Sequence, residues 1–122
     1  MIMKALVVDD SSFYVQLIGR VLKSEGMTVL VAYSGMEALK VLEKEKPDFI
    51  LLDLLMPQMS GYDVLEMLKS KEETKSIPVI VLSANNSANR EAIEMGAQGC
   101  LQKPIDDEAL VQQLKEILHV KI

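Results

Sequence analysis

Short runs of consecutive apolar residues alternate along the chain with longer segments in which apolar residues recur every three or four positions. Five such runs occur, at residues 5–8, 27–32, 49–52, 79–82 and 99–102. Unbroken apolar runs are typical of strands buried on both faces of a sheet, whereas recurrence at three and four is typical of a helix with one buried face. The pattern therefore predicts five parallel strands, each followed by a helix.

The segment after the first strand has the clearest helical pattern. Its apolar stripe consists of Tyr14, Leu17, Ile18, Val21 and Leu22. This stripe leaves Phe13 off the buried face, so Phe13 is predicted either to lie exposed, where it could anchor a partner's helix, or to pack locally against the loop after the third strand. The next helix is predicted to begin at Ser34, because Ser34 and Glu37 match a capping box, in which each side chain accepts a hydrogen bond from the other residue's backbone N–H.

The remaining helices have weaker boundaries. Two are predicted to begin near Ser60 and Asp106, and a third, around residues 90–95, to end at Gly96 in the position of a C′ glycine. Residues 85–89 are small and polar, so we expect them to form a mobile loop. Right-handed crossovers then give an α/β fold, a five-stranded parallel sheet sandwiched by five helices.

Composition narrows the class of protein. The 122 residues are 49% hydrophobic and 25% charged, which predicts one globular domain over residues 1–122. The net charge of −5 argues against direct binding to nucleic acid, which needs clustered Lys and Arg. Cys100 is the single cysteine, and the N-terminal segment fits neither a signal peptide nor a membrane span. We therefore expect a soluble, cytoplasmic protein without membrane contact.

Polar residues stand at the ends of four of the five apolar runs. Asp9 and Asp10 follow the first run, Asp53 the third, Ser83 the fourth and Lys103 the fifth. The carboxyl ends of parallel strands meet at one edge of a sheet, where ligands bind. Two carboxylates about 4 Å apart repel by about 4 kcal/mol at an effective dielectric of about 20, so three together predict a bound cation, with Mg²⁺ (or Mn²⁺) favoured by the oxygen donors. Together with a hydroxyl and an ammonium, this set indicates phosphoryl transfer.

The combined motifs resemble a known family. Asp9-Asp10, the segment from Asp53 to Pro57, Ser83-Ala84 and Lys103-Pro104 are similar to the signature of the response regulator receiver domain of two-component signalling, including the chemotaxis regulators. The resemblance extends from Lys4 to about Leu118. It implies a flavodoxin-like receiver fold with strand order 2-1-3-4-5. It also implies a phosphoprotein that receives a phosphoryl group from a histidine kinase or a histidine phosphotransfer protein.

The resemblance also assigns residue roles. It implies that Asp53 is the phospho-acceptor, forming an aspartyl phosphate. Asp10, Asp53 and the Leu55 carbonyl are implied to ligate Mg²⁺, with Asp9 acting mostly through water. Lys103 is implied to pair with one phosphoryl oxygen and Ser83 to donate to another, and the peptide bond before Pro104 is implied to be cis. Phosphorylation would then move Ser83 and the loop after the fourth strand, altering protein contacts or allowing an onward phosphorelay.

Three positions depart from the usual pattern or tune it. Cys100 occupies the place of the aromatic side chain that commonly turns inward on phosphorylation. Because no Tyr or Phe follows Tyr62, we expect no nearby aromatic to replace it. Leu55 and Asn85 occupy the rim positions that tune hydrolysis of the aspartyl phosphate, and we expect a long-lived phosphoryl group because neither orients water well.

Other functions fit less well. A phosphatase of the haloacid dehalogenase type needs a second Asp two positions after the first, and a nucleotide-binding module needs a loop without Asp9 and Asp10. A phosphorylation-independent pseudo-receiver, acting as an interaction module, stays open as the alternative. We expect the chain to be no enzyme beyond its own phosphorylation and dephosphorylation, and to be a monomer or weak dimer. The downstream target and the question whether the domain stands alone stay open.

Overall fold

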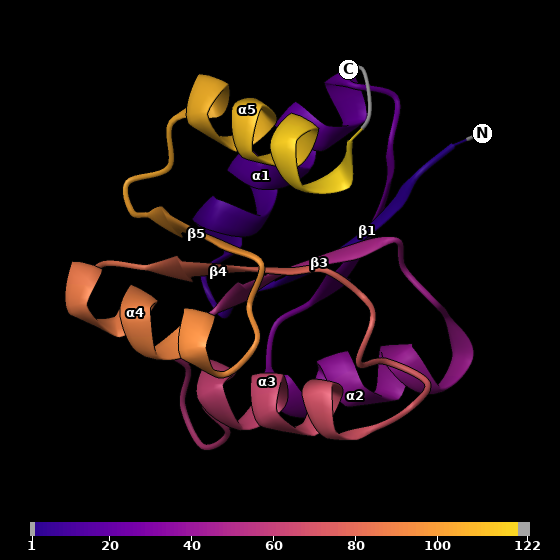
Figure 1. Cartoon of the computed structure of the whole chain (residues 1–122). Coiled ribbons are helices and arrows are strands. Elements are labelled where there is room, and N and C mark those ends of the chain that lie inside the picture. The colour runs from indigo at the N-terminus through magenta and orange to yellow at the C-terminus, as the bar shows by residue number, and fades with distance from the viewer. Residues whose placement is uncertain (1, 120–122) are drawn as a thin grey trace.

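A five-stranded parallel sheet between two layers of helices forms the fold of the computed structural model, which describes residues 2–119 (Figure 1). The strand order is β2-β1-β3-β4-β5, as expected from the resemblance. The elements in chain order are β1 (Lys4–Val8), α1 (Ser12–Ser24), β2 (Thr28–Ala32), α2 (Gly35–Lys44), β3 (Phe49–Asp53), α3 (Gly61–Ser70), β4 (Val79–Ser83), α4 (Asn86–Glu94), β5 (Gly99–Gln102) and α5 (Asp107–Leu118).

The helices divide between the two faces of the sheet. Helices α1 and α5 cover one face, and α2, α3 and α4 cover the other (Figure 1). Every residue of the central strands β3 and β4 is buried, because both of their faces are covered. Two apolar clusters result, one on each side.

The strand register decides which side chains meet at the carboxyl edge. Val8 is paired with Leu52, so the next residue on each strand, Asp9 and Asp53, follows at the same level. Ser83 is paired with Gln102, which places Lys103 just beyond it. The edge that the sequence predicted is therefore formed, with its polar residues on neighbouring strands.

The helix caps partly differ from the prediction. The Ser34 hydroxyl accepts from the Glu37 N–H at 3.1 Å, but the Glu37 carboxylate accepts from the Tyr33 N–H, so the predicted reciprocal box is only half made. A complete box stands at α3 instead, where Ser60 and Asp63 bond each other's backbone N–H. The sequence did not predict this box, because a capping box usually has Glu or Gln, not Asp, at the third position of the helix.

The fourth helix begins earlier than predicted. The expected mobile loop at residues 85–89 is wrong, because α4 already begins at Asn86. The Asn85 side chain caps it by accepting from the Ser87 N–H at 2.9 Å and the Ser87 hydroxyl at 2.8 Å. The apolar pattern gave no sign of this first turn because its side chains are small or polar. The helix ends as predicted before Gly96, whose φ of +110° suits glycine.

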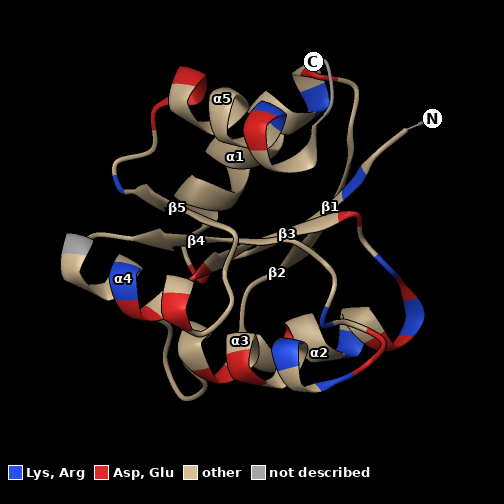
Figure 2. Ribbon diagram, viewed as in Figure 1, with Lys and Arg blue, Asp and Glu red and all other residues tan. Residues whose placement is uncertain are grey.

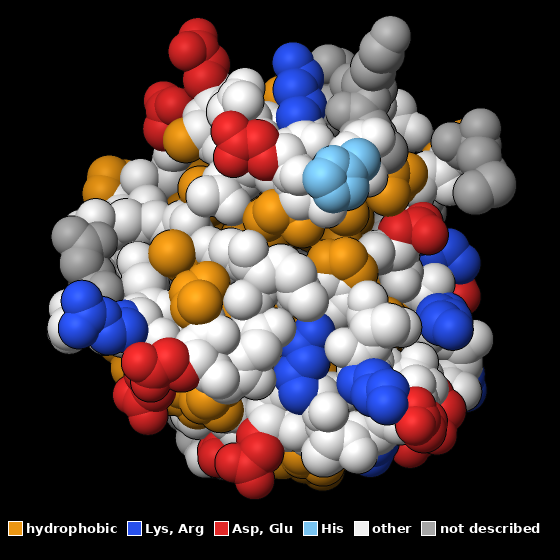
Figure 3. All heavy atoms as spheres, in the orientation of Figure 1, with side chains coloured by type: hydrophobic (Ala, Val, Ile, Leu, Met, Phe, Trp, Pro, Cys, Tyr) orange, Lys and Arg blue, Asp and Glu red, His pale blue; other side chains and the backbone are white. Residues whose placement is uncertain are grey.

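Charged residues lie mostly on the helices and the connecting loops, while the sheet interior is apolar (Figure 2). On the face seen in Figure 3, acidic and basic side chains are interspersed and form no large patch of one sign. Of the helices within residues 2–119, none has the length and apolar character needed to cross a membrane.

Candidate functional site

Three carboxylates meet at the carboxyl edge of the sheet. Asp9 and Asp10 directly follow β1, and Asp53 is the last residue of β3. Each of the three offers one carboxylate oxygen such that these oxygens all lie within 4.8 Å of one another. Asp9 is fully buried and Asp53 is 3% exposed, whereas Asp10 is exposed. The structure thus brings together the acidic residues that the sequence predicted.

Lys103 joins this cluster from the end of β5. Its Nζ lies 2.9 Å from Asp9 Oδ2 and 3.4 Å from Asp53 Oδ1, so one ammonium forms ion pairs with both buried carboxylates. The Lys103–Pro104 peptide bond is cis. The same Nζ also lies 4.3 Å from the centre of the Tyr14 ring, a contact that the sequence did not reveal. Tyr14 belongs to the apolar stripe of α1, and that stripe gives no sign of a contact with the residue that follows the last strand.

The charged groups of the site alter one another's pKa values. Burial raises the pKa of the Asp53 carboxyl from 3.8 to about 6, and the negative charge of Asp9 adds to this rise while Lys103 opposes it. Burial alone would lower the pKa of Lys103, but its contacts with Asp9 and Asp53 outweigh burial and hold this pKa above 10.5. The single ammonium therefore does not fully compensate the buried carboxylates, and a further cation would stabilise the cluster.

The cluster suits a divalent cation. Three carboxylates supply the hard oxygen donors that Mg²⁺ and Mn²⁺ accept. Apart from its ion pair with Lys103, Asp9 Oδ2 is buried and has no hydrogen-bond partner among the described residues. A buried oxygen that lacks a full set of partners is expected where an ion or water completes the site. Asp9, Asp10 and Asp53 are accordingly the residues that would hold the metal.

The loop after β3 is fixed against the strand end by backbone contacts. The Leu55 N–H donates to Asp53 Oδ1 at 3.4 Å, and the Gly61 N–H donates to the Leu54 carbonyl at 3.0 Å. A Cβ at Gly61 would collide with the carbonyl oxygen of Asp53, so only glycine lets the start of α3 approach β3 this closely. The Asp53 carboxylate is thereby oriented by its own loop, while the Leu55 side chain is 68% exposed at the rim.

Ser83 lies at the edge but points its hydroxyl toward its own loop. It is 2% exposed, and its Oγ donates to the Asn85 carbonyl at 2.9 Å and accepts from the Asn85 N–H at 3.0 Å. Within residues 2–119, the Ser83 hydroxyl bonds with the Asn85 backbone and not with Asp53. The predicted contact of Ser83 with a group on Asp53 therefore requires that these loop bonds break first.

Tyr62, the last aromatic residue of the sequence, contacts α4. The Tyr62 hydroxyl donates to the Ala88 carbonyl in the first turn of α4 at 3.3 Å. Cys100, in the place of the usual aromatic, is half-buried and packs against the same apolar cluster as Tyr62. The apolar pattern did not reveal the contact of Tyr62 with Ala88, because these two residues are 26 positions apart in the sequence.

Phe13 is exposed, as the stripe on α1 predicts, with 66% of its surface accessible. Its ring packs edge-on against Tyr14, with centroids 5.2 Å apart. Tyr33 and Leu55 are also exposed in the segments that follow β2 and β3, and Met36 is exposed in the first turn of α2. Exposed apolar groups at the same edge as an acidic cluster are typical of a surface that meets a protein partner.

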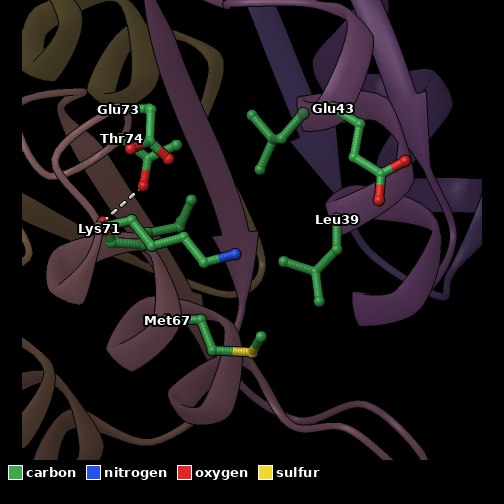
Figure 4. Close-up of a pocket in the computed structure, with 8 residues that line it drawn as sticks. Leu39, Glu43, Met67, Lys71, Glu73 and Thr74 are labelled. Atoms are coloured by element: carbon green, nitrogen blue, oxygen red, sulfur yellow. Dashed lines mark hydrogen bonds between the residues drawn. The ribbon is translucent and has the colours of Figure 1, made fainter.

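A separate pocket lies between α2 and α3 (Figure 4). It has a volume of about 260 Å³, and Leu39, Glu43, Met67, Lys71 and Thr74 are among its lining residues. Leu39 and Glu43 belong to α2, Met67 to the last turn of α3, and Lys71 and Thr74 to the segment between α3 and β4. In a parallel sheet with crossover helices, helix ends lie at the edge opposite to the strand ends. The pocket is thus distinct from the acidic cluster.

Comparison with known proteins shows which family the chain resembles. The family model described as "Response regulator receiver domain" matches residues 5–115. The transcriptional regulatory protein CpxR of Escherichia coli (strain K12) is 38% identical over 118 residues, which are 95% of this chain and 49% of that protein. The chain therefore spans about half the length of this relative.

Solved structures show the same architecture. The chemotaxis response regulator CheY4 of Vibrio cholerae matches with a TM-score of 0.90 and 30% identity, covering 96% of this chain and 99% of that one. The receiver domain of the sensor histidine kinase PA1611 from Pseudomonas aeruginosa PAO1 matches with a TM-score of 0.88 and 26% identity, covering 98% and 100%. That structure has a magnesium ion coordinated in its active site cleft.

Proposed function

Since the chain belongs to the response regulator receiver family, we propose that Asp53 accepts a phosphoryl group from a phosphohistidine on a partner protein. Receiver domains interact with histidine kinases or phosphotransfer proteins, so either class is the expected donor. The observation that carries the proposal is the contact of Lys103 with the Asp53 carboxylate inside the acidic cluster. A nucleophile, a cation for the phosphoryl oxygens and a set of metal donors are thereby gathered in one place.

The transfer exchanges one bond of phosphorus for another. A carboxylate oxygen of Asp53 forms a P–O bond while the P–N bond to the donor histidine breaks. The electron pair of the P–N bond stays on the imidazole nitrogen, and the ring leaves as neutral imidazole because its other nitrogen carries a proton. The pKa of Asp53, about 6, lies below neutral pH. At neutral pH most molecules therefore have an ionised Asp53 carboxylate, which is the nucleophilic form.

The chain's own residues hold the transferred group. Lys103 already lies 3.4 Å from Asp53 Oδ1, so its ammonium can pair with a phosphoryl oxygen attached there. The Ser83 hydroxyl can donate to another oxygen after it leaves Asn85. Mg²⁺ or Mn²⁺ held by Asp9, Asp10, Asp53 and the Leu55 carbonyl would supply positive charge that offsets the carboxylates and the phosphoryl oxygens.

The movement of Ser83 would convert phosphorylation into a signal. Asn85 caps α4, so breaking its bonds with Ser83 shifts the start of this helix, which Tyr62 also contacts. The altered surface would then bind a downstream protein or pass the phosphoryl group onward in a phosphorelay. The chemistry of the chain would be confined to phosphorylation and dephosphorylation of its own Asp53. A cytoplasmic place follows from this role, because the donor histidine would be there.

The direct test is labelling by phosphoramidate, a small donor that needs no partner protein. We expect intact-mass spectrometry to show one added phosphoryl group in the presence of Mg²⁺, and none in EDTA or in Asp53→Asn. A matched control is Asp107→Asn, since Asp107 is an exposed carboxylate on α5 outside the cluster. This variant should be labelled as the wild type is.

Two outcomes would contradict the proposal. Labelling that persists in Asp53→Asn would place the acceptor elsewhere. A wild type that takes no label at any Mg²⁺ concentration, yet is folded, would favour the alternative of a phosphorylation-independent interaction module.

A further inference from the structure

We propose that Tyr14 is a positioning residue for Lys103, holding the ammonium against Asp53 with the face of its ring. This inference rests on the proposed function, because it concerns the geometry in which Asp53 is phosphorylated. It assigns a role in the site to a residue that the apolar pattern of α1 accounts for only as part of the core.

The surroundings of the Lys103 ammonium are filled from three sides. Asp9 Oδ2 lies 2.9 Å from Nζ, Asp53 Oδ1 lies 3.4 Å from it, and the Tyr14 ring centre lies 4.3 Å from it. Only 15% of the Lys103 side chain is exposed. An ammonium within about 6 Å of an aromatic centre is attracted by the negative face of the ring, more strongly when water is excluded. The ring thus contributes to the site electrostatically as well as sterically.

The ring is itself held in place by the start of α1. The Tyr14 N–H donates to the Ser11 hydroxyl at 3.4 Å, and the Ser11 N–H donates to Asp9 Oδ1 at 2.9 Å. Tyr14 also packs against the apolar cluster on the α1 side of the sheet, and Phe13 meets its ring edge-on at 81°. One turn of α1 therefore fixes both Asp9 and the ring relative to the sheet.

The ring matters because Lys103 must serve two successive partners. Before transfer it pairs with Asp53, and afterwards it must reach an oxygen of the phosphoryl group attached there. An aromatic face attracts a cation without demanding one direction, so Lys103 can turn toward the new oxygen while staying over the ring. Without the ring, the flexible Lys side chain samples more positions, and fewer of them support the transfer.

The first experiment measures labelling by phosphoramidate in saturating Mg²⁺. In this reaction an oxygen of Asp53 forms a P–O bond while the P–N bond of phosphoramidate breaks. The electron pair of that bond stays on the protonated amine nitrogen, which leaves as ammonia. We expect Tyr14→Leu, which keeps apolar bulk, to be labelled about three to ten times more slowly, as a cation–π contact of typical strength implies. Tyr14→Phe, which keeps the ring, should stay within about twofold of the wild type. Lys23→Leu is the control and should be labelled as the wild type is, because Lys23 is exposed in the last turn of the same helix, away from the cluster.

The second experiment separates attraction from packing. Phenylalanine with an increasing number of fluorine atoms, placed at position 14, keeps nearly the same shape while the negative face of the ring weakens. Labelling should slow progressively along this series. In parallel, the ε-methylene proton signals of Lys103 should be shifted upfield by the ring in the wild type and in Tyr14→Phe, and should lose that shift in Tyr14→Leu.

The inference is overturned if fluorination leaves the rate unchanged, or if Tyr14→Leu is labelled as fast as Tyr14→Phe. It is also overturned if the Lys103 proton signals do not differ between Tyr14→Leu and the wild type. A wild type that cannot be labelled at all would instead remove the proposed function. The proton shifts then decide alone whether the ring holds the ammonium.

Discussion

Lys103 lies closer to Asp9 than to the proposed acceptor Asp53, with Nζ 2.9 Å from Asp9 Oδ2 and 3.4 Å from Asp53 Oδ1. Its positive charge is thus shared between two buried carboxylates that repel each other. This arrangement makes Lys103 a determinant of stability as well as of chemistry, because removing one partner of a buried pair leaves the other charge uncompensated.

We therefore predict that Lys103→Met lowers the free energy of unfolding by about 1–3 kcal/mol in EDTA, somewhat less than for a fully buried pair because Lys103 is partly exposed. Urea denaturation followed by circular dichroism measures this loss. Mg²⁺ should restore part of it, since a dication offsets the same carboxylates. The matched control is Lys23→Met, an exposed lysine in the last turn of α1, which should change stability by no more than about 0.5 kcal/mol. Equal losses in the two variants would show that Lys103 does not stabilise the cluster.

Asp10 provides a test of the metal. In EDTA, Asp10→Asn should raise the melting temperature by about 1–4 °C, because it removes one of three clustered negative charges. At Mg²⁺ concentrations about ten times the dissociation constant, the wild type should gain about 1.4 kcal/mol, and Asp10→Asn should gain less because it has lost a ligand. Differential scanning calorimetry of both proteins with and without Mg²⁺ checks this. Identical melting temperatures in all four samples would mean that the acids do not share a cation.

The pKa of Asp53 predicts a pH dependence in the metal-free protein. Its value of about 6 in the folded state exceeds the ordinary 3.8, so the folded state binds this proton more tightly than the unfolded chain does. This tighter proton binding adds to the free energy of unfolding. The contribution is fully present below pH 3.8 and is lost as the pH rises through 6. Asp53→Asn abolishes this loss. Its stability relative to the wild type should therefore be about 1–2 kcal/mol more favourable at pH about 7.5 than at pH about 4.5.

Urea denaturation in EDTA at the two pH values measures this difference. Saturating Mg²⁺ serves as the control, because the charge of the ion should shrink the difference. A relative stability that is the same at both pH values in EDTA would show that Asp53 ionises in the folded protein as it does in the unfolded chain.

The strands and the site edge were predictable because their signals are local. Each unbroken apolar run gave a strand, and the residue after each run had to lie at the carboxyl edge. Strands β3 and β4 are buried throughout and β1 nearly so, whereas the edge strands β2 and β5 are only partly buried because one of their sides has no neighbouring strand. The convergence of Asp53 and Lys103 followed from this geometry, while the strand order came from the family resemblance. The local pattern thus predicted which polar residues lie at the carboxyl edge, but not which of them contact one another.

The contacts that escaped prediction join residues that are distant along the chain or depend on small polar side chains. Tyr14 contacts Lys103 because the fold brings the first turn of α1 next to the residue that follows β5. The first turn of α4 has no apolar stripe, and its stability comes from the Asn85 cap. The sequence correctly placed Ser83 at the edge, but it could not show that the Ser83 hydroxyl bonds with the Asn85 backbone.

We expect the lifetime of the phosphoryl group proposed on Asp53 to depend on the rim of the site, where Leu55 and Asn85 both lie exposed. An apolar side chain and an uncharged amide orient an attacking water poorly, so hydrolysis of the aspartyl phosphate should be slow. Leu55→Asn adds an amide that can hold a water molecule, and Asn85→Asp adds a carboxylate that can accept its proton. We predict that each substitution speeds the loss of the phosphoryl group about threefold to tenfold, less than a well-placed general base achieves.

The measurement is the decay of phosphorylated protein after phosphoramidate is removed, followed by intact-mass spectrometry in Mg²⁺. Asn85→Ser is the control for the second variant, because Ser still caps a helix start but lacks the carboxylate. It separates chemistry at the rim from a displaced α4. If neither Leu55→Asn nor Asn85→Asp decays faster than the wild type, the rim does not limit hydrolysis. Access of water to Asp53, which is 3% exposed, would then set the lifetime.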